Sequence, residues 1–212
     1  CLGRGVFSGC SYLTNVTLNV GVKTIGVNAF SGCGRLGAFT MPEGLTRLGD
    51  YAFNGCTQLE EVSIAPSVES WGSYVFSVCT KLTSVAIPEG IREIGSYAFA
   101  GCGKLREVQI ASSVQSIGSY AFQNCTSLEE LLIPKTVQSS GDSVFAGCAN
   151  LKKLTMPFVG NRRGNADSWD AFFAQMFADA AFEGGVRVQQ YYGSSSSYYR
   201  YAYLPTNLTT VV

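Results

Sequence analysis

The sequence predicts an α/β solenoid, in which one short structural unit is repeated along the chain and stacked on itself. Phenylalanine, cysteine and leucine form three columns with a constant spacing of 23 residues along the 212-residue chain. Each unit also contains a stretch of alternating apolar and polar residues, which is typical of a strand with one buried face. A repeat of this length is typical of solenoids, in which each unit packs on its neighbours.

Seven copies of the unit can be aligned through these columns. Phenylalanine lies at Phe7, Phe30, Phe53, Phe76, Phe99, Phe122 and Phe145. Cysteine follows three residues later, at Cys10, Cys33, Cys56, Cys79, Cys102, Cys125 and Cys148. Leucine follows after another three, at Leu13, Leu36, Leu59, Leu82, Leu105, Leu128 and Leu151. Two further apolar columns keep the same register, so the pattern cannot be a coincidence.

The first part of each unit predicts a short strand. In one copy, Leu82, Val85 and Ile87 alternate with polar residues, so that one face of the strand is directed inward. Pro88 follows, and proline ends a strand because it has no N–H for the next ladder hydrogen bond.

The second part of each unit predicts a corner and a turn. A glycine column, represented by Gly95, is suited to a corner with unusual dihedral angles or a close backbone approach. Ala98, Phe99 and Cys102 follow, at a spacing that places all three on one face of a single helical or 3-10 turn.

Two blocks of the unit, residues 82–88 (LTSVAIP) and 94–102 (IGSYAFAGC), are similar to a known family. Over residues 2 to about 157 the sequence resembles the BspA-like class of leucine-rich repeat proteins. The resemblance implies a right-handed coil with a parallel sheet on the concave side and short helical or 3-10 turns on the convex side. Members of this family are typically secreted or cell-surface proteins of host-associated microbes, and they are linked to adhesion.

Three regions are expected along the chain. Residues 1–157 form the solenoid of about seven coils, which begins within a coil and so predicts an N-terminally truncated fragment. Residues 158–207 form an irregular insertion, because Leu208 follows Leu151 by 57 residues instead of 23. The insertion is expected to contain an amphipathic helix over 168–182 and a tyrosine-rich hairpin. Residues 208–212 are expected to start a further coil.

The cysteine column is predicted to be a row of buried free thiols. Seven of the eight cysteines belong to it, and a thiol is a compact, nearly apolar group that fills a core. Disulfides between coils and a metal site are the alternatives. Zinc is disfavoured because a parallel column does not supply four converging ligands. At least six of these cysteines are expected to be reduced and inaccessible in the native chain.

Catalytic chemistry is not expected. Histidine is absent from the sequence, which excludes a Ser-His-Asp or Cys-His arrangement. Two pairs of carboxylates, Glu60 with Glu61 and Glu129 with Glu130, are adjacent in sequence, and adjacent strand residues point to opposite sides. No phosphate-binding glycine motif or calcium loop is found. The sequence therefore predicts a protein that is not an enzyme and needs no cofactor or metal.

Composition limits the classes of partner. Fifteen basic residues balance fifteen acidic residues, whereas a generic nucleic-acid binder needs a basic surplus. No apolar stretch reaches the about 18 residues that a membrane span requires. We therefore expect neither nucleic-acid binding nor membrane insertion within this chain.

The concave face of the sheet is the first candidate for a binding surface. Strand positions between the inward columns are directed outward there. The candidate residues are Asn15, Thr17, Thr40, Glu61, Ser63, Ser84, Glu107, Gln109, Glu130, Leu132, Lys153 and Thr155. Residues 59–130 contain four basic and eight acidic groups, whereas residues 131–163 contain five basic groups and one acidic group. The surface is therefore expected to have an acidic middle and a basic end, and most of that basic patch is supplied by Lys152, Lys153, Arg162 and Arg163. Ordinary solubility explains such a surface as well as a binding role does.

Tyrosines form the second candidate surface. Tyr51, Tyr74, Tyr97 and Tyr120 form a column, and Tyr191, Tyr192, Tyr198, Tyr199 and Tyr201 are grouped near the C-terminal end. Tyrosine beside serine and glycine is typical of adaptable binding loops. The alternative is that these rings cover the convex side of the solenoid and pack the hairpin.

We therefore expect a non-enzymatic adhesion or protein-interaction module that binds a macromolecular partner, a protein or a glycan at a host or cell surface. The family resemblance implies an extracellular or cell-surface location. An architectural spacer that displays other domains, and an accessory region of a larger enzyme, are the alternatives.

Overall fold

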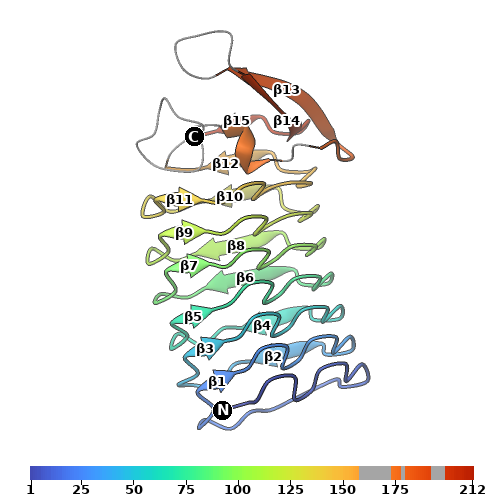
Figure 1. Cartoon of the computed structure of the whole chain (residues 1–212), viewed down its shortest axis with the longest axis vertical. Helices are drawn as coiled ribbons and strands as arrows, with labels where there is room; N and C mark the ends of the chain where they lie inside the picture. Colours follow the sequence, from blue (N-terminus) through green and yellow to red (C-terminus); the bar gives the residue numbers. More distant parts are fainter. Residues whose placement is uncertain (158–172, 178–179, 192–198) are drawn as a thin grey trace.

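The described part of the chain, residues 1–157, 173–177, 180–191 and 199–212 of a computed structural model, is a stack of coils. The N-terminal coil lies at one end of the stack and a two-stranded hairpin lies at the other (Figure 1). Between residues 36 and 150, each coil contributes one longer strand, one shorter strand and a turn, so three columns of backbone run along the stack.

The longer strands of successive coils lie in parallel register. Val85 lies opposite Val108, and Leu131 lies opposite Leu154, so neighbouring strands are offset by one repeat. Hydrogen-bonded groups are β2 with β4, β6 with β8, and β10 with β12 and β15. These strands are β2 (Ala38–Thr40), β4 (Glu61–Ser63), β6 (Ser84–Ile87), β8 (Glu107–Ile110), β10 (Glu130–Leu132), β12 (Lys153–Thr155) and β15 (Thr210–Val211). The predicted solenoid with a parallel sheet is confirmed.

A second column of two-residue strands, also parallel, lies beside the glycine corner of each coil. It consists of β1 (Thr24–Ile25), β3 (Arg47–Leu48), β5 (Ser70–Trp71), β7 (Glu93–Ile94), β9 (Ser116–Ile117) and β11 (Ser139–Ser140). The sequence analysis did not predict these strands, because two residues are too few for an alternating pattern to be visible.

The turn side of the coils differs from the expected helical turns. The N–H of Phe30 donates to the carbonyl oxygen of Ala52 in the next coil (2.8 Å), whereas the N–H of Ser31 donates to Asn28 in its own coil (3.1 Å). Because alternate N–H groups are used between coils, no continuous helical ladder forms. The turn is instead a series of overlapping β-turns, in which the N–H groups of Ala29, Ser31 and Cys33 each donate to the carbonyl oxygen three residues earlier. Asn28 lies in the left-handed region at φ 56°.

The phenylalanine column forms the centre of the hydrophobic core. From Phe7 to Phe145, neighbouring rings are stacked with centroids 5.1–6.0 Å apart and planes within 15° of each other. All of these rings from Phe30 onward are fully buried. Each coil therefore completes the packing of its neighbours, which is why the units stack.

Six cysteines of the column are buried and free, whereas Cys1 and Cys10 are exposed at the N-terminal end. Each buried thiol donates a hydrogen bond to the phenylalanine carbonyl oxygen of the preceding coil, at 3.1–3.3 Å. Burial raises the pKa of the Cys102 thiol to about 12. The column is therefore a ladder of neutral hydrogen-bond donors as well as a core filler.

The glycine column is required by close approach between coils. A Cβ atom at Gly49 would lie 2.5 Å from the backbone nitrogen of Val27, and one at Gly118 would lie 2.5 Å from the backbone nitrogen of Ser96. Neither glycine has a positive φ. Of the two reasons considered for the corner, close approach is the one that applies.

The last coil is built from segments that are far apart in the sequence. Phe177 lies against Phe145 with ring centroids 5.9 Å apart, and the N–H of Phe145 donates to the carbonyl oxygen of Met176 (2.7 Å). At the strand position, Val211 of β15 pairs with Leu154 of β12. Phe177 thus occupies the next place in the phenylalanine column, 32 residues after Phe145 instead of 23.

The segment between these two positions contains a hairpin, in which β13 (Gly185–Tyr191) pairs antiparallel with β14 (Tyr199–Pro205). Of the helix expected over 168–182, the described residues form one 3-10 turn, η2 (Phe173–Met176), and residues 180–182 are not helical. The carbonyl oxygens of Gln175 and Met176 accept hydrogen bonds from Ser143 and Phe145 of the preceding coil. Residues 168–172 and 178–179 lie outside the described residues.

Candidate binding surface

The outward side chains of the longer strands, together with those of the equivalent N-terminal segment, form a surface that we call the strand face. In β6, Val85 and Ile87 are buried while Ser84 and Ala86 are exposed, as the pleat of a strand with one buried side requires. The same alternation in the other coils aligns the outward side chains in two parallel columns.

Eleven of the twelve candidate residues are exposed on the strand face, and Thr155 is half-buried. The exposed ones are Asn15, Thr17, Thr40, Glu61, Ser63, Ser84, Glu107, Gln109, Glu130, Leu132 and Lys153. Leu132 is a large apolar residue that is 61% exposed. The structure therefore places the candidates on one side of the stack; it does not test which of them contact a partner.

Ion pairs between coils alter the expected charge pattern. Lys152 Nζ lies 2.7 Å from Glu129 Oε2, and Lys153 Nζ lies 3.9 Å from Glu130 Oε2. The basic end is therefore neutralised in part by the acidic coil next to it. The hydrogen bond from Lys152 and its positive charge hold the pKa of the Glu129 carboxyl below its ordinary value. Arg162 and Arg163, also expected in the basic patch, lie outside the described residues.

Two carboxylates of the strand face are left without a cation. Within the described ranges, neither Glu61 nor Glu107 is within 4.0 Å of a lysine or arginine nitrogen. Glu60, the neighbour of Glu61, pairs with Lys81 at 3.2 Å. The unpaired charge of the strand face is therefore negative.

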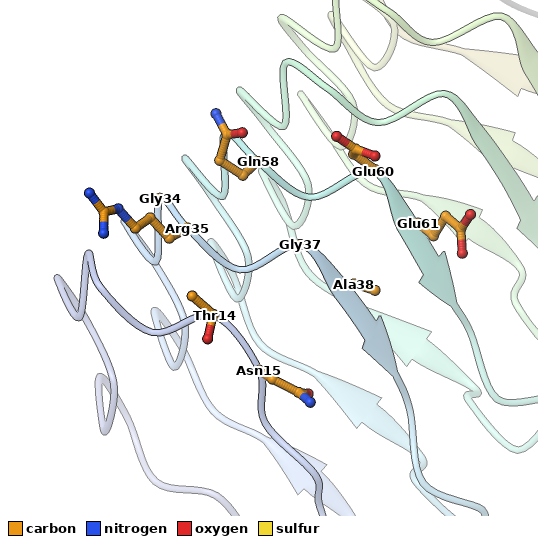
Figure 2. A pocket seen from close by; sticks show the side chains of 9 residues that line it. All are labelled: Thr14, Asn15, Gly34, Arg35, Gly37, Ala38, Gln58, Glu60 and Glu61. Atoms are coloured by element: carbon orange, nitrogen blue, oxygen red, sulfur yellow. The ribbon is translucent and has the colours of Figure 1, made fainter.

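A hollow of about 850 Å³ lies at the N-terminal part of the strand face, around Ala38 at the start of β2. Figure 2 shows Ala38 between Asn15 and Glu61, which come from the coils on either side. Gly34 and Gly37 also line the hollow. It exists because this coil has glycine or alanine where the neighbouring coils have longer polar side chains.

Two smaller hollows, of about 250 and 240 Å³, also include Ala38 in their lining. They extend along the strand toward Thr40. A further hollow of about 540 Å³ lies three to four coils away and is lined by Arg106, Glu107 and Glu130, among others. Its carboxylates include the two that pair with Lys152 and Lys153.

The tyrosine column is a stacked ladder. Neighbouring rings from Tyr51 to Tyr120 have centroids 4.4–4.7 Å apart and planes within 12° of each other. Each of these tyrosines has a positive φ of 56–59°, at the position that Asn28 occupies in an earlier coil. Because the ring faces cover one another, their edges are what solvent reaches.

Of the tyrosines near the C-terminal end, Tyr201 is 38% exposed and its ring is covered by Arg187, whose guanidinium carbon is 3.7 Å from the ring centroid. Tyr191 and Tyr199 pair at the end of the hairpin strands. Tyr192 and Tyr198 lie outside the described residues. A binding role for this second surface stays a prediction.

The described residues hold no group of three or more histidine, cysteine or carboxylate side chains that could bind a metal ion. Over the same ranges, the structure has no helix long and apolar enough to cross a membrane. The side chains that the structure brings together are therefore those of an extended polar surface with hollows.

A family model described as BspA type leucine-rich repeat region matches residues 1–88 and 64–164, in six copies. The chain belongs to the BspA-type leucine-rich repeat family. The resemblance read from the repeat is thereby confirmed. No protein with a curated description matches the sequence.

Solved structures of bacterial leucine-rich repeat proteins are similar to this BspA-type chain. A leucine-rich cell surface protein from Faecalibacterium prausnitzii is 33% identical with a TM-score of 0.69, over 73% of this chain and 42% of that protein. A leucine-rich repeat protein from Bacteroides ovatus is 30% identical with a TM-score of 0.62, over 76% of this chain and 48% of that protein. A leucine-rich repeat protein of T. pallidum is 28% identical with a TM-score of 0.61, over 70% and 71%. The chain thus spans less than half the length of the first two.

Sequence reasoning missed the hollow around Ala38. Two of its lining residues, Asn15 and Glu61, were candidates, but Arg35, Ala38 and Gln58 were not. A usable signal exists in the sequence, because this copy has Gly37 and Ala38 where the preceding copy has threonine and asparagine (14 and 15) and the following copy has two glutamates (60 and 61). Small side chains at repeat positions where the neighbouring copies have longer side chains predict a hollow in the surface.

Proposed function

We propose that this chain is a non-enzymatic interaction module of a cell-surface or secreted protein, and that its strand face binds a macromolecular partner. The observation on which the proposal rests is the row of exposed polar side chains that parallel strands hold in register on one side of a rigid stack. Repeat proteins commonly use such extended surfaces for recognition. The family suggests a protein as the partner.

Electrostatics favour the strand face as the site of contact. Glu61 and Glu107 are exposed and have no cation within 4.0 Å among the described residues. A basic partner can form new pairs with them, without first breaking an existing one. Such charges increase the association rate and fix the orientation of a partner more than they tighten the complex.

The surface location is supported by a relative. The F. prausnitzii structure is described as that of a cell surface protein, and we extend that location to this chain. An adhesive role at a host or cell surface is part of the same proposal.

Charge reversal on the strand face tests the proposal. A variant with Glu61→Lys, Glu107→Lys and Glu130→Lys is compared with a control that has Glu43→Lys, Glu69→Lys and Glu93→Lys, which are exposed and outside the strand face. Both variants have the same net charge, and both are assayed on cultured epithelial cells and on immobilised extracellular-matrix proteins. We expect the strand-face variant to lose most of the binding of the parent and the control to keep it. Equal binding by both variants contradicts the proposal, and absence of binding by the parent favours an architectural spacer.

A further inference from the structure

The hollow around Ala38 is large enough to receive one long side chain. Its volume is about 850 Å³, and the small residues Gly34, Gly37 and Ala38 form part of its lining. Ala38 is exposed and lies directly opposite Glu61 in the parallel register. A methyl group at this strand position leaves one flank of the Glu61 side chain open.

Of the two carboxylates that line the hollow, one has a cation partner among the described residues and the other does not. Lys81 pairs with Glu60 at 3.2 Å. The guanidinium of Arg35 lies over the ring of Tyr12, 4.6 Å from its centroid, and Figure 2 shows that the Arg35 side chain points away from Glu61. The Glu61 carboxylate has no cation within 4.0 Å in the described ranges. Of the two carboxylates, Glu61 is therefore the one that is open to pairing with an incoming cation, and the Arg35 guanidinium is directed away from it.

The other polar side chains bordering the hollow add hydrogen-bond acceptors. Asn15 lies across Ala38 from Glu61, and Gln58 lies on the same rim as Glu60 (Figure 2). Each amide has a carbonyl oxygen that accepts hydrogen bonds. A ligand group that matches this lining needs a positive charge and several N–H donors that point in different directions.

We propose that the Ala38 hollow receives an arginine side chain of the protein partner, with Glu61 as its counter-ion. The inference rests on the proposed function of the strand face and adds the chemistry of the anchoring residue. A guanidinium fits because it is planar, always charged and has five N–H donors in a fork that matches a carboxylate. No aromatic ring lines the hollow among the described residues, so the stacking platform that a sugar ring would use is missing.

The second hollow is a weaker match for the same ligand. Two of its three carboxylates, Glu129 and Glu130, are paired with Lys152 and Lys153, and the third, Glu107, directly follows Arg106, which also lines this hollow. A cation entering it would compete with these groups. Glu107 is therefore the matched control for Glu61, because both occupy the same position of the repeat on the strand face.

Titration with capped amino acids tests the inference on the whole chain, without knowledge of the partner. The probes are N-acetyl-argininamide and N-acetyl-citrullinamide, which have nearly the same shape but differ in charge. Backbone amide shifts are followed by ¹H–¹⁵N NMR. We expect saturable shifts at Gly37, Ala38 and Glu61 with the arginine probe, and at least fivefold weaker binding of the citrulline probe, because the ion pair is lost.

Four variants separate the hollow from general attraction. Glu61→Gln and Ala38→Met are expected to weaken arginine binding at least fivefold, the first by removing the charge and the second by placing a long side chain in the space beside Glu61. Glu107→Gln and Ala86→Met, on exposed positions of the same strand face, are expected to change it less than twofold. Equal binding of the two probes, equal loss with Glu107→Gln, or no saturable shift at Ala38 would overturn the inference.

The outcomes also separate this inference from the proposed function. In one outcome, the arginine probe binds in a way that depends on Glu61, but the strand-face variant binds the partner as well as the parent does. The hollow is then an arginine site, and the proposed function of the strand face is wrong. In the other outcome, the strand-face variant loses partner binding, but the arginine probe does not bind at all. The proposed function of the strand face then stands, and the hollow is not an arginine site.

Discussion

The thiol of Cys102 donates a hydrogen bond of 3.2 Å to the backbone carbonyl oxygen of Phe76, in the preceding coil. The same carbonyl oxygen accepts the backbone N–H of Cys79 within its own coil. The thiol thus uses the second lone pair of a carbonyl group that is buried in the core. This relationship recurs along the cysteine column and links each coil to its neighbour through the side chain.

Replacement of a buried cysteine is expected to destabilise the stack. For Cys102→Ala we expect the free energy of unfolding to fall by about 1–3 kcal/mol, because the variant loses a buried sulfur and leaves a small cavity. Cys10→Ala, at the exposed end of the same column, is the control and should change stability by less than about 0.5 kcal/mol. Urea unfolding measures both. Equal effects of the two substitutions would contradict a structural role for the ladder.

Native labelling with a thiol reagent should separate the cysteines into two classes. Cys1 and Cys10 are exposed and should react quickly, whereas the six buried thiols should react only after unfolding. Fast labelling of more than two cysteines in the native chain, or failure to label all eight after denaturation, would count against buried free thiols.

The buried thiols also predict a dependence of stability on alkaline pH. Burial raises the pKa of Cys33 from 9.0 to about 11 and that of Cys102 from 9.0 to about 12. At a pH above 9 but below its raised pKa, each thiol is neutral in the folded chain and ionised in the unfolded chain. Its stabilising contribution is therefore complete below about pH 9 and decreases above it, by about 1.4 kcal/mol per pH unit for each such thiol.

The measurement is the free energy of unfolding between pH 8 and 10.5. The free energy of unfolding should fall more steeply with pH in the parent than in Cys102→Ala, and the difference in slope should be that of one thiol. Identical slopes for the two proteins would show that Cys102 does not ionise on unfolding in this range.

The glycine corner gives a steric prediction. A Cβ atom at Gly118 would lie 2.5 Å from the backbone nitrogen of Ser96, which cannot move without displacing a whole coil. We expect Gly118→Ala to reduce the free energy of unfolding by about 2–4 kcal/mol. Gly103→Ala is the control, because a Cβ there meets only the Thr126 hydroxyl at 3.5 Å. Thermal unfolding of the two variants distinguishes close approach from a general effect of glycine.

The tyrosine ladder combines a stacking contribution with an unfavourable backbone conformation. Tyr97 has φ 56°, and its ring lies 4.4 Å from Tyr74 and 4.7 Å from Tyr120. Both Tyr97→Val and Tyr97→Asn lose the stacking, but asparagine tolerates the left-handed region and a β-branched residue does not. We expect Tyr97→Val to be less stable than Tyr97→Asn by about 1 kcal/mol. The reverse order in urea unfolding would contradict the assigned conformation.

The sequence was sufficient to predict the parallel stack, because the constant spacing places Val85 beside Val108 and every other column in the same way. It was not sufficient for the turn side. The spacing of Ala98, Phe99 and Cys102 is compatible with a helical turn and with a series of overlapping β-turns. The choice depends on hydrogen bonds to the next coil, such as that from the Phe99 N–H to Ala121.

The candidate surface was predictable in outline, since alternation along a strand determines which side chains are directed outward. Its electrostatics were not, because the net charge of a segment does not reveal which groups pair. Lys152 and Lys153 were expected to form a basic end, but each has a glutamate of the preceding coil beside it. The eighth place of the phenylalanine column was also hidden, because Phe177 reaches it after an irregular spacing.

The central claim is that recognition resides on the strand face and is separate from what holds the stack together. The most direct test is to measure stability and cell or matrix binding on the same preparation of the Glu61→Lys, Glu107→Lys, Glu130→Lys variant. We predict a free energy of unfolding within about 1 kcal/mol of the parent, because exposed charges contribute little to stability, together with loss of most of the binding. A folded variant that binds as well as the parent would contradict the claim.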